Sequence, residues 1–148
     1  MFNIFKERMA TNISRIEINT DLDKVWSALT KPELVKQWQY ASELTTDWKI
    51  GSKISFKNEW ESKVFEQYGT VLAFNPNKNL KYSLFFPRPD VEDKPKNYFE
   101  MEYRLTTIGS KTLLEIIQED NRADAKQEEI QGEENPILKS LKILLERE

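Results

Sequence analysis

The sequence contains neither histidine nor cysteine. The absence of cysteine excludes disulfide bonds and a thiol nucleophile, and the absence of histidine removes the commonest general base and the commonest metal ligand. Carboxylates alone would have to hold a metal ion, yet the sequence has no EF-hand loop and no glycine-rich phosphate loop. We therefore expect no metal site, no cofactor and no catalytic residues of the usual acid–base kind.

The sequence also lacks a large excess of either charge and lacks long apolar runs. The 22 basic and 25 acidic residues give a net charge of -3, and the basic residues form no stripe. Nucleic-acid binding is therefore not expected. No apolar run approaches the roughly 20 residues of a membrane span, and the N-terminal segment MFNIFKERMATN lacks a signal-peptide core. We expect a cytoplasmic protein with no membrane span.

Aromatic side chains, in contrast, are abundant. The 148 residues include 4 Trp, 5 Tyr and 8 Phe. A chain of this length suits one domain with a substantial core, which we expect over residues 12–148 after a tail at 1–11, where Met9 is a candidate second start site. The aromatic content fits either a core that contains a pocket or a core that is simply rich in aromatic residues.

Alternation of apolar and polar residues predicts an antiparallel sheet. The first predicted strand covers residues 12–19, with Ile16 and Ile18 on one face. The inward face of 67–74 is ambiguous, because Val71 and Ala73 compete with Leu72 and Phe74. The later strands follow one another through turns, which favours antiparallel pairing; they are predicted at 53–60, 67–74, 80–86, 98–106 and 112–119.

Two short helices are predicted between the strand at 12–19 and the strand at 53–60. Thr20 is the expected N-cap of the first helix, whose apolar face combines Leu22, Val25, Trp26 and Leu29. Thr30 is the expected N-cap of the second helix, which has Pro32 in its first turn and ends near Trp38.

A final helix is predicted after Asn135, with Pro136 at its first position. Its apolar stripe would pack across the inner face of the sheet; the stripe contains Ile137, Leu138, Leu141, Leu144 and Leu145. This order predicts an α+β, helix-grip (Bet v 1-like) fold, in which a curved antiparallel sheet wraps around the C-terminal helix and two short helices follow the first strand. Space between helix and sheet would accommodate a ligand.

The stretch VWSALTKPELVKQW resembles a signature of the activator of Hsp90 ATPase homologue 1-like family, within the START-like (SRPBCC) superfamily. The matching residues are Ile18, Val25, Trp26, Ala28, Leu29, Thr30, Pro32, Glu33 and Trp38, followed by Asp47, Gly51, Gly69, Val71 and Pro76. The chain departs from the family at Ser52, where a second glycine is common, and at Asn135-Pro136, where Gly-Trp often opens the last helix. The resemblance implies the helix-grip fold, in a superfamily of lipid carriers, hormone binders, cyclases and chaperone co-factors.

The inward strand positions supply the candidate binding residues. Asn58 is the polar member of the set, and either a ligand or the chain itself would satisfy its amide. The predicted pocket wall comprises Trp38, Phe56, Asn58, Trp60, Tyr82, Phe99, Met101 and Tyr103.

Three functions remain open at this point. The first is binding of a hydrophobic or aromatic small molecule or lipid, with the proline-rich loop 88–96 as a mobile lid. The second is a chaperone co-factor or other protein-binding module, to which the resemblance points. The third is a cyclase- or hydratase-like enzyme, in which Tyr68, Tyr82 or Tyr103 would polarise a carbonyl, because the carboxylates fall mostly on outward strand positions.

Overall fold

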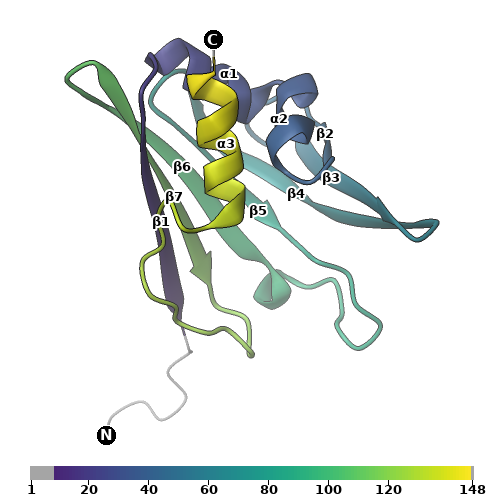
Figure 1. Cartoon of the computed structure of the whole chain (residues 1–148). Coiled ribbons are helices and arrows are strands. Elements are labelled where there is room, and N and C mark those ends of the chain that lie inside the picture. Colours follow the sequence, from purple (N-terminus) through teal and green to yellow (C-terminus); the bar gives the residue numbers. More distant parts are fainter. Residues whose placement is uncertain (1–8, 148) are drawn as a thin grey trace, which may run out of the picture.

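The computed structural model describes residues 9–147, which form one seven-stranded sheet with three α-helices packed on one of its faces (Figure 1). All neighbouring strands are antiparallel, in the order β1-β7-β6-β5-β4-β3-β2. The strands are β1 Ala10–Ile18, β2 Glu43–Thr45, β3 Lys53–Trp60, β4 Lys63–Asn75, β5 Asn79–Leu84, β6 Phe99–Ile108 and β7 Lys111–Asp120. The helices are α1 Leu22–Thr30, α2 Pro32–Trp38 and α3 Pro136–Glu146, with a 3₁₀ turn η1 at Pro95–Asn97. The predicted helix-grip fold is confirmed.

One edge of the sheet is formed by β1, which pairs with a strand that is distant in sequence. β1 begins at Ala10, two residues earlier than expected, and pairs along its whole length with β7. At the other edge lies β2, which the sequence did not predict because three residues are too few to show an alternating pattern. None of the helices among residues 9–147 has the length and apolar character needed to cross a membrane.

The N-caps predicted for α1 and α2 were each wrong by one residue. Asp21 caps α1, and its carboxylate accepts a hydrogen bond from the Lys24 amide at 3.0 Å. The Thr20 carbonyl is instead held by the Thr112 hydroxyl of β7 at 2.8 Å, which keeps Thr20 in the preceding turn.

At the second helix, Thr30 ends α1 and its hydroxyl donates back to the Trp26 carbonyl at 2.8 Å. Lys31 occupies the N-cap position of α2 without a side-chain hydrogen bond. Its backbone is extended, as expected for a residue that precedes proline, so the break between the helices falls at Lys31.

The inward face of β4 was ambiguous in the sequence because the strand contains an irregularity. Its pairing with β5 shifts register between Val71 and Ala73. As a result Val71 and Phe74 both face the core, although they are three residues apart, and Leu72 between them is exposed.

Trp48, to which the sequence assigned no role, completes the aromatic part of the core. Its ring stacks on Phe74 with centroids 5.3 Å apart, and Phe74 packs at the same distance against Trp26 of α1. The Trp48 indole also donates to the Thr30 carbonyl at 3.0 Å, which links the segment before β3 to the end of α1.

Helix α3 is anchored at both its apolar and its polar positions. Leu138 and Leu141 are buried against the sheet and the other helices. The Lys142 ammonium donates to the Glu17 carbonyl, and the Glu146 carboxylate accepts from the Asn19 amide, each at 2.7 Å. Figure 1 shows α3 lying across the sheet, between β1 and the helix pair α1–α2.

Candidate functional site

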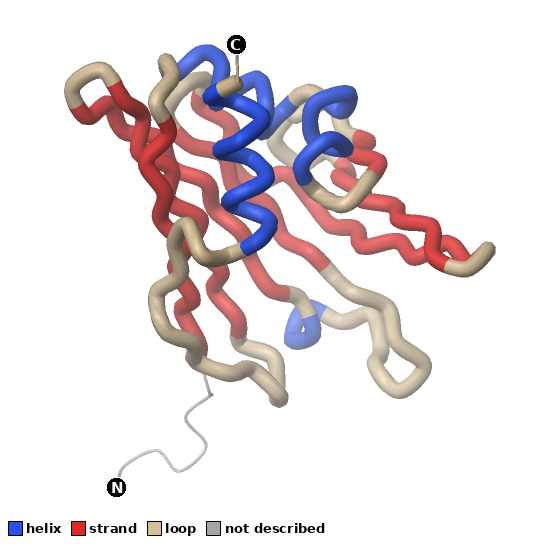
Figure 2. The backbone as a smooth tube through the Cα atoms, viewed as in Figure 1, coloured by secondary structure: helices blue, strands red, loops and turns tan. Residues whose placement is uncertain are grey.

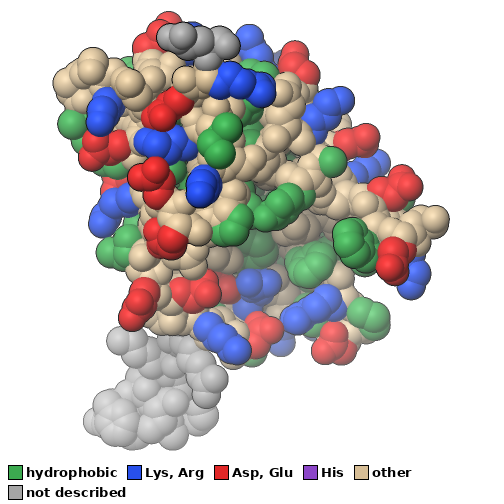
Figure 3. Space-filling view, viewed as in Figure 1, with side chains coloured by type: hydrophobic (Ala, Val, Ile, Leu, Met, Phe, Trp, Pro, Cys, Tyr) green, Lys and Arg blue, Asp and Glu red, His purple; other side chains and the backbone are tan. Residues whose placement is uncertain are grey.

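A cleft of about 560 Å³ lies between the sheet and the N-terminal half of α3; we call it the α3 lobe. Figure 3 shows this face hollowed between α3 and the projecting β3–β4 hairpin. Strands β1, β3, β4, β6 and β7 contribute to its wall, together with the end of α2 and the segment before α3. The lining residues are Asn12, Ile13, Ser14, Trp38, Gln39, Tyr40, Ser42, Asn58, Gln67, Met101, Tyr103, Ile116, Gln118, Glu128, Glu129, Gln131, Asn135, Ile137 and Leu138.

A second hollow of about 260 Å³, which we call the β5 lobe, continues the cleft along the sheet. Its own lining residues are Phe56, Tyr82, Leu84 and Phe99. The two lobes share the walls formed by Gln39, Ser42, Gln67, Met101, Tyr103 and Gln118. A combined cleft of this size is in the range that holds small molecules.

The structure brings together seven of the eight residues predicted for the pocket wall. Trp38 and Asn58 line the α3 lobe, whereas Met101 and Tyr103 line both lobes. The remaining three line the β5 lobe: Phe56, Tyr82 and Phe99. Their proximity is a property of the fold, and their role in ligand binding remains a prediction.

Trp60 was predicted to face inward and does not. Its side chain is 69% exposed and lines neither lobe. The alternation of β3 continues to Trp60, but the last residues of β3 belong to a hairpin that projects beyond the helices, as Figure 2 shows. There is no core for an inward side chain to enter at that point.

Asn58 is satisfied within the chain. Its amide nitrogen donates to the Tyr40 carbonyl at 3.1 Å and lies 2.9 Å from the Ser42 hydroxyl. Asn58 therefore fixes the turn after α2 at the rim of the cleft. Of the two readings left open by the sequence, the structure favours the one in which the chain supplies its partners.

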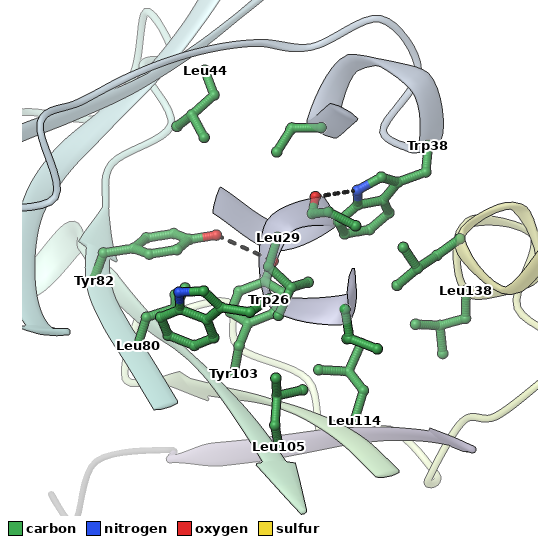
Figure 4. Packing of buried hydrophobic residues seen from close by; sticks show 14 of the residues in the cluster. Trp26, Leu29, Trp38, Leu44, Leu80, Tyr82, Tyr103, Leu105, Leu114 and Leu138 are labelled. Carbon is green, nitrogen blue, oxygen red and sulfur yellow. Dashed lines mark hydrogen bonds between the residues drawn. The ribbon is translucent and has the colours of Figure 1, made fainter. Parts of the chain in front are cut away.

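Trp38 is buried in the wall of the α3 lobe, where Leu138 of α3 also lies (Figure 4). Its indole N–H donates to the Ala28 carbonyl at 2.8 Å. This bond joins the end of α2 to α1, so Trp38 positions the helix pair as well as bordering the cleft.

Several polar residues of the cleft were missed by the sequence reasoning. Gln67 and Gln118 line both lobes, and neither side chain has a hydrogen-bond partner within residues 9–147. A signal was available, because Gln118 has the same strand parity as the inward Leu114 and Ile116. The two amides give the wall of the cleft positions that can donate to or accept from a bound molecule.

Two tyrosine hydroxyls meet at the boundary of the lobes. The Tyr82 hydroxyl donates to that of Tyr103 across 3.2 Å, and the rings lie nearly parallel with centroids 6.0 Å apart (Figure 4). Burial raises the pKa of Tyr82 well above its usual value and also raises the pKa of Tyr103. Both groups are therefore neutral hydroxyls near pH 7, not phenolate bases.

The carboxylates considered for catalysis lie away from the cleft. Glu115 pairs with Arg15 at 2.8 Å, Glu102 with Arg104 at 3.0 Å and Glu100 with Lys81 at 3.1 Å. None of these three lines either lobe. Residues 9–147 contain no cluster of three or more carboxylates placed to hold a metal ion.

The mouth of the α3 lobe is formed by the acidic segment before α3. It runs along the outer edge of β1: the Arg15 amide donates to the Gln131 carbonyl at 2.9 Å, and the Gln131 amide donates to the Ile13 carbonyl at 3.0 Å. Glu128 and Glu129 are the only charged residues, among those described, that line either lobe.

The loop 88–96, proposed from the sequence as a mobile lid, lines neither lobe. It is fastened to the sheet by Asp93, whose carboxylate accepts from the hydroxyls of Tyr68 at 2.6 Å and Tyr98 at 2.7 Å. These hydrogen bonds lower the pKa of Asp93, while burial and the bond to Asp93 raise the pKa of Tyr98 to about 12.

We expect Asp93→Asn to loosen this loop, because an amide oxygen cannot serve both hydroxyls as a carboxylate does. Amide hydrogen exchange over 87–97 should accelerate at neutral pH, and the pKa of Tyr98 should fall toward 10. Asp90→Asn, an exposed change in the same loop, is the matched control and should leave both values unchanged.

The same contact predicts a pH dependence. Because the folded pKa of Asp93 is depressed, its stabilising effect is complete above the unfolded pKa and is lost as the pH falls through the folded value. The protection of the amides over 87–97, taken as the ratio of the intrinsic to the observed exchange rate at each pH, should therefore fall at acidic pH in the native chain and converge on that of Asp93→Asn. A difference in protection between the two chains that stays constant across the acidic range would contradict the assignment.

Comparison with known proteins places this architecture in a family. The family model described as Activator of Hsp90 ATPase homolog 1-like protein matches residues 19–146. No protein among the curated ones matches the sequence significantly.

Solved structures share the fold. The solution structure of ChR145 from Cytophaga hutchinsonii is 36% identical, covers 76% of this chain and 78% of its own, and has a TM-score of 0.62. MLL2253 from Mesorhizobium loti is 22% identical over 93% of this chain and 97% of its own, with a TM-score of 0.71. The Aha1 dimer from Colwellia psychrerythraea is 18% identical over 93% of this chain and 97% of its own, with a TM-score of 0.65. The last two likenesses concern the fold alone.

Proposed function

Since this chain belongs to the activator of Hsp90 ATPase homolog 1-like family, whose START-like fold leaves a cleft between sheet and helix, we propose that it binds a hydrophobic or aromatic small molecule there. The observation that carries this proposal is the two-lobed cleft itself. The β5 lobe is lined mostly by aromatic and aliphatic side chains, and the α3 lobe adds polar side chains, among them the amides of Gln67 and Gln118, so that the cleft offers both apolar surface and hydrogen-bonding groups to a small molecule.

The arrangement supports binding better than catalysis. The cleft residues include no histidine or cysteine, and its buried tyrosines stay protonated near neutral pH. Among the described residues, the only carboxylates that line it are those of Glu128 and Glu129, which are exposed at its mouth. Proton transfer to or from a molecule deep in the cleft therefore has no evident donor or acceptor pair of matched pKa.

Native mass spectrometry against a library of lipids and aromatic compounds tests the proposal. We expect one-to-one complexes with compounds that fit the cleft. Met101→Trp should abolish them or weaken them about tenfold or more, because Met101 lies where the lobes join and an indole would fill that space.

The matched control is Ile143→Trp, which adds the same side chain at a position of α3 that is 59% exposed and lines neither lobe. It should bind as the native chain does. Complexes that persist in Met101→Trp, or a library that yields no complex with the native chain, would contradict ligand binding in this cleft.

A chaperone co-factor is the second candidate, favoured by the family description and by one surface feature. The projecting end of the β3–β4 hairpin exposes Trp60, Val64 and Phe65, and such an apolar tip is suited to contact another protein. The two candidates use different parts of the chain. A chaperone role would therefore survive Met101→Trp, which fills the cleft and leaves the hairpin intact.

A further inference from the structure

The hydroxyls of Tyr82 and Tyr103 form a buried polar pair in the wall of the cleft. Tyr82 is 4% exposed and Tyr103 is 7% exposed, yet both line the β5 lobe and Tyr103 also lines the α3 lobe. Figure 4 shows the Tyr82 hydroxyl, on β5, directed at Tyr103 on β6.

The hydrogen bond between the two hydroxyls leaves one of their protons available for a further hydrogen bond. Two hydroxyls carry two protons, and their mutual hydrogen bond uses one of them. With Tyr82 as the donor, the proton of Tyr103 remains, and within residues 9–147 the structure gives it no acceptor. Each hydroxyl oxygen has the other as a hydrogen-bond partner, and Tyr103 keeps a proton with which it can make a second hydrogen bond. Here the free proton borders the cleft, where a bound molecule can accept it.

The pair is also set up to donate rather than to accept. Burial holds both hydroxyls in the neutral form. Because Tyr103 accepts from Tyr82, its own O–H bond is polarised, and hydrogen-bond chains of this kind strengthen the terminal donor. A carbonyl or similar oxygen next to Tyr103 would receive that donation.

The charges of the cleft select among possible acceptors. No Lys or Arg among the described residues lines either lobe, and the charged lining residues Glu128 and Glu129 are both negative. A carboxylate entering the cleft would lose its hydration without gaining a cationic partner. A neutral acceptor has no such cost.

We propose, building on ligand binding in the cleft, that the Tyr103 hydroxyl is the specificity-determining donor to a neutral carbonyl oxygen, so that the cleft takes uncharged carbonyl compounds and rejects carboxylic acids. Tyr82 acts through Tyr103 as a positioning residue. Three naphthalenes of similar size serve as probes: 2-acetylnaphthalene, which carries a carbonyl, 2-ethylnaphthalene, which carries no acceptor, and 2-naphthoate, which carries a charge.

Affinities are measured by isothermal calorimetry or by quenching of tryptophan fluorescence. We expect 2-acetylnaphthalene to bind, and 2-naphthoate to bind at least about tenfold more weakly. Tyr103→Phe should weaken 2-acetylnaphthalene about fivefold and leave 2-ethylnaphthalene unchanged, because only the ketone uses the hydroxyl. The carbonyl stretching frequency of the bound ketone, read by infrared difference spectroscopy, should rise in Tyr103→Phe.

Two further variants locate the effect. Tyr82→Phe keeps the Tyr103 donor and should change the ketone affinity by less than about threefold. Tyr68→Phe removes a hydroxyl that binds Asp93 outside the cleft and should change neither affinity, which controls for a general effect of losing a tyrosine hydroxyl.

The outcomes separate this inference from the proposal on which it rests. If the ketone and 2-ethylnaphthalene bind and respond equally to Tyr103→Phe, the assignment of Tyr103 is overturned and cleft binding stands. Binding of 2-naphthoate as tight as that of the ketone overturns the charge argument. If none of the probes binds and the wider library is also silent, both fail.

Discussion

Replacement of Trp26 by alanine is expected to lower the free energy of unfolding by about 4 kcal/mol, and Tm by roughly 12 °C. The indole is 9% exposed and packs against Phe74, which in turn stacks on Trp48. Its removal leaves a large apolar cavity where α1 meets the β4 irregularity, and the rings beyond it lose their support. Chemical denaturation followed by circular dichroism measures the loss.

Trp60→Ala is the matched control, because it removes the same side chain from an exposed position. We expect a change of less than about 0.5 kcal/mol. A loss below 1 kcal/mol for Trp26→Ala would mean that α1 is not docked on the sheet as described. A loss at Trp60 as large as that at Trp26 would mean that the hairpin end is buried in solution.

Gly69→Ala is expected to have the second large effect, a loss of about 3 kcal/mol or more. A methyl group on Gly69 would overlap the carbonyl oxygen of Ser83 on β5 and lie 2.5 Å from its carbonyl carbon. Both are backbone atoms, so no side-chain rotation relieves the overlap, and β4 and β5 would have to separate. The thermal unfolding midpoint, or the yield of folded protein, reports the result.

Gly109→Ala provides the opposite situation in the same chain. Its surroundings are open, but its φ of 59° disfavours a side chain, so we expect a loss of about 1 kcal/mol from backbone conformation alone. If Gly69→Ala costs no more than Gly109→Ala, the close approach of β4 to Ser83 is not present in solution.

The helices and strands could be predicted from local sequence patterns, because each pattern arises from the burial of one face of a single element. The alternation in the first part of β3 and the apolar stripe of α3 reflect one buried face each, and the structure buries Ile54, Phe56, Leu138 and Leu141 as expected. The N-cap of α1 was displaced by one residue because Thr20 and Asp21 are both good capping residues; Asp21 accepts from the Lys24 amide, while the Thr20 carbonyl accepts from Thr112, far along the chain.

Parts of the cleft could not be predicted from the sequence, because they depend on contacts between distant segments. Trp60 continues the alternation of β3, yet the sequence does not reveal where the helices stop covering the sheet. The segment around Gln131 is polar and shows no periodicity, although it pairs with the edge of β1 and forms the mouth of the cleft. In contrast, Gln118 shares the strand parity of the inward Leu114 and Ile116 and was predictable as a cleft residue.

The pairing of β1 with β7 also bears on the order in which the protein can fold. Arg15 and Glu115 are one hundred residues apart in sequence, and their contact forms within this pair of strands. During synthesis, β1 would emerge from the ribosome long before its only partner strand, and contacts of such high sequence separation form slowly. The α3 lobe depends on still later residues, because Gln131 and Leu138 line it. A nascent chain would therefore complete this cleft last, after Trp26 of α1 and Trp38 of α2 had been synthesised for most of translation.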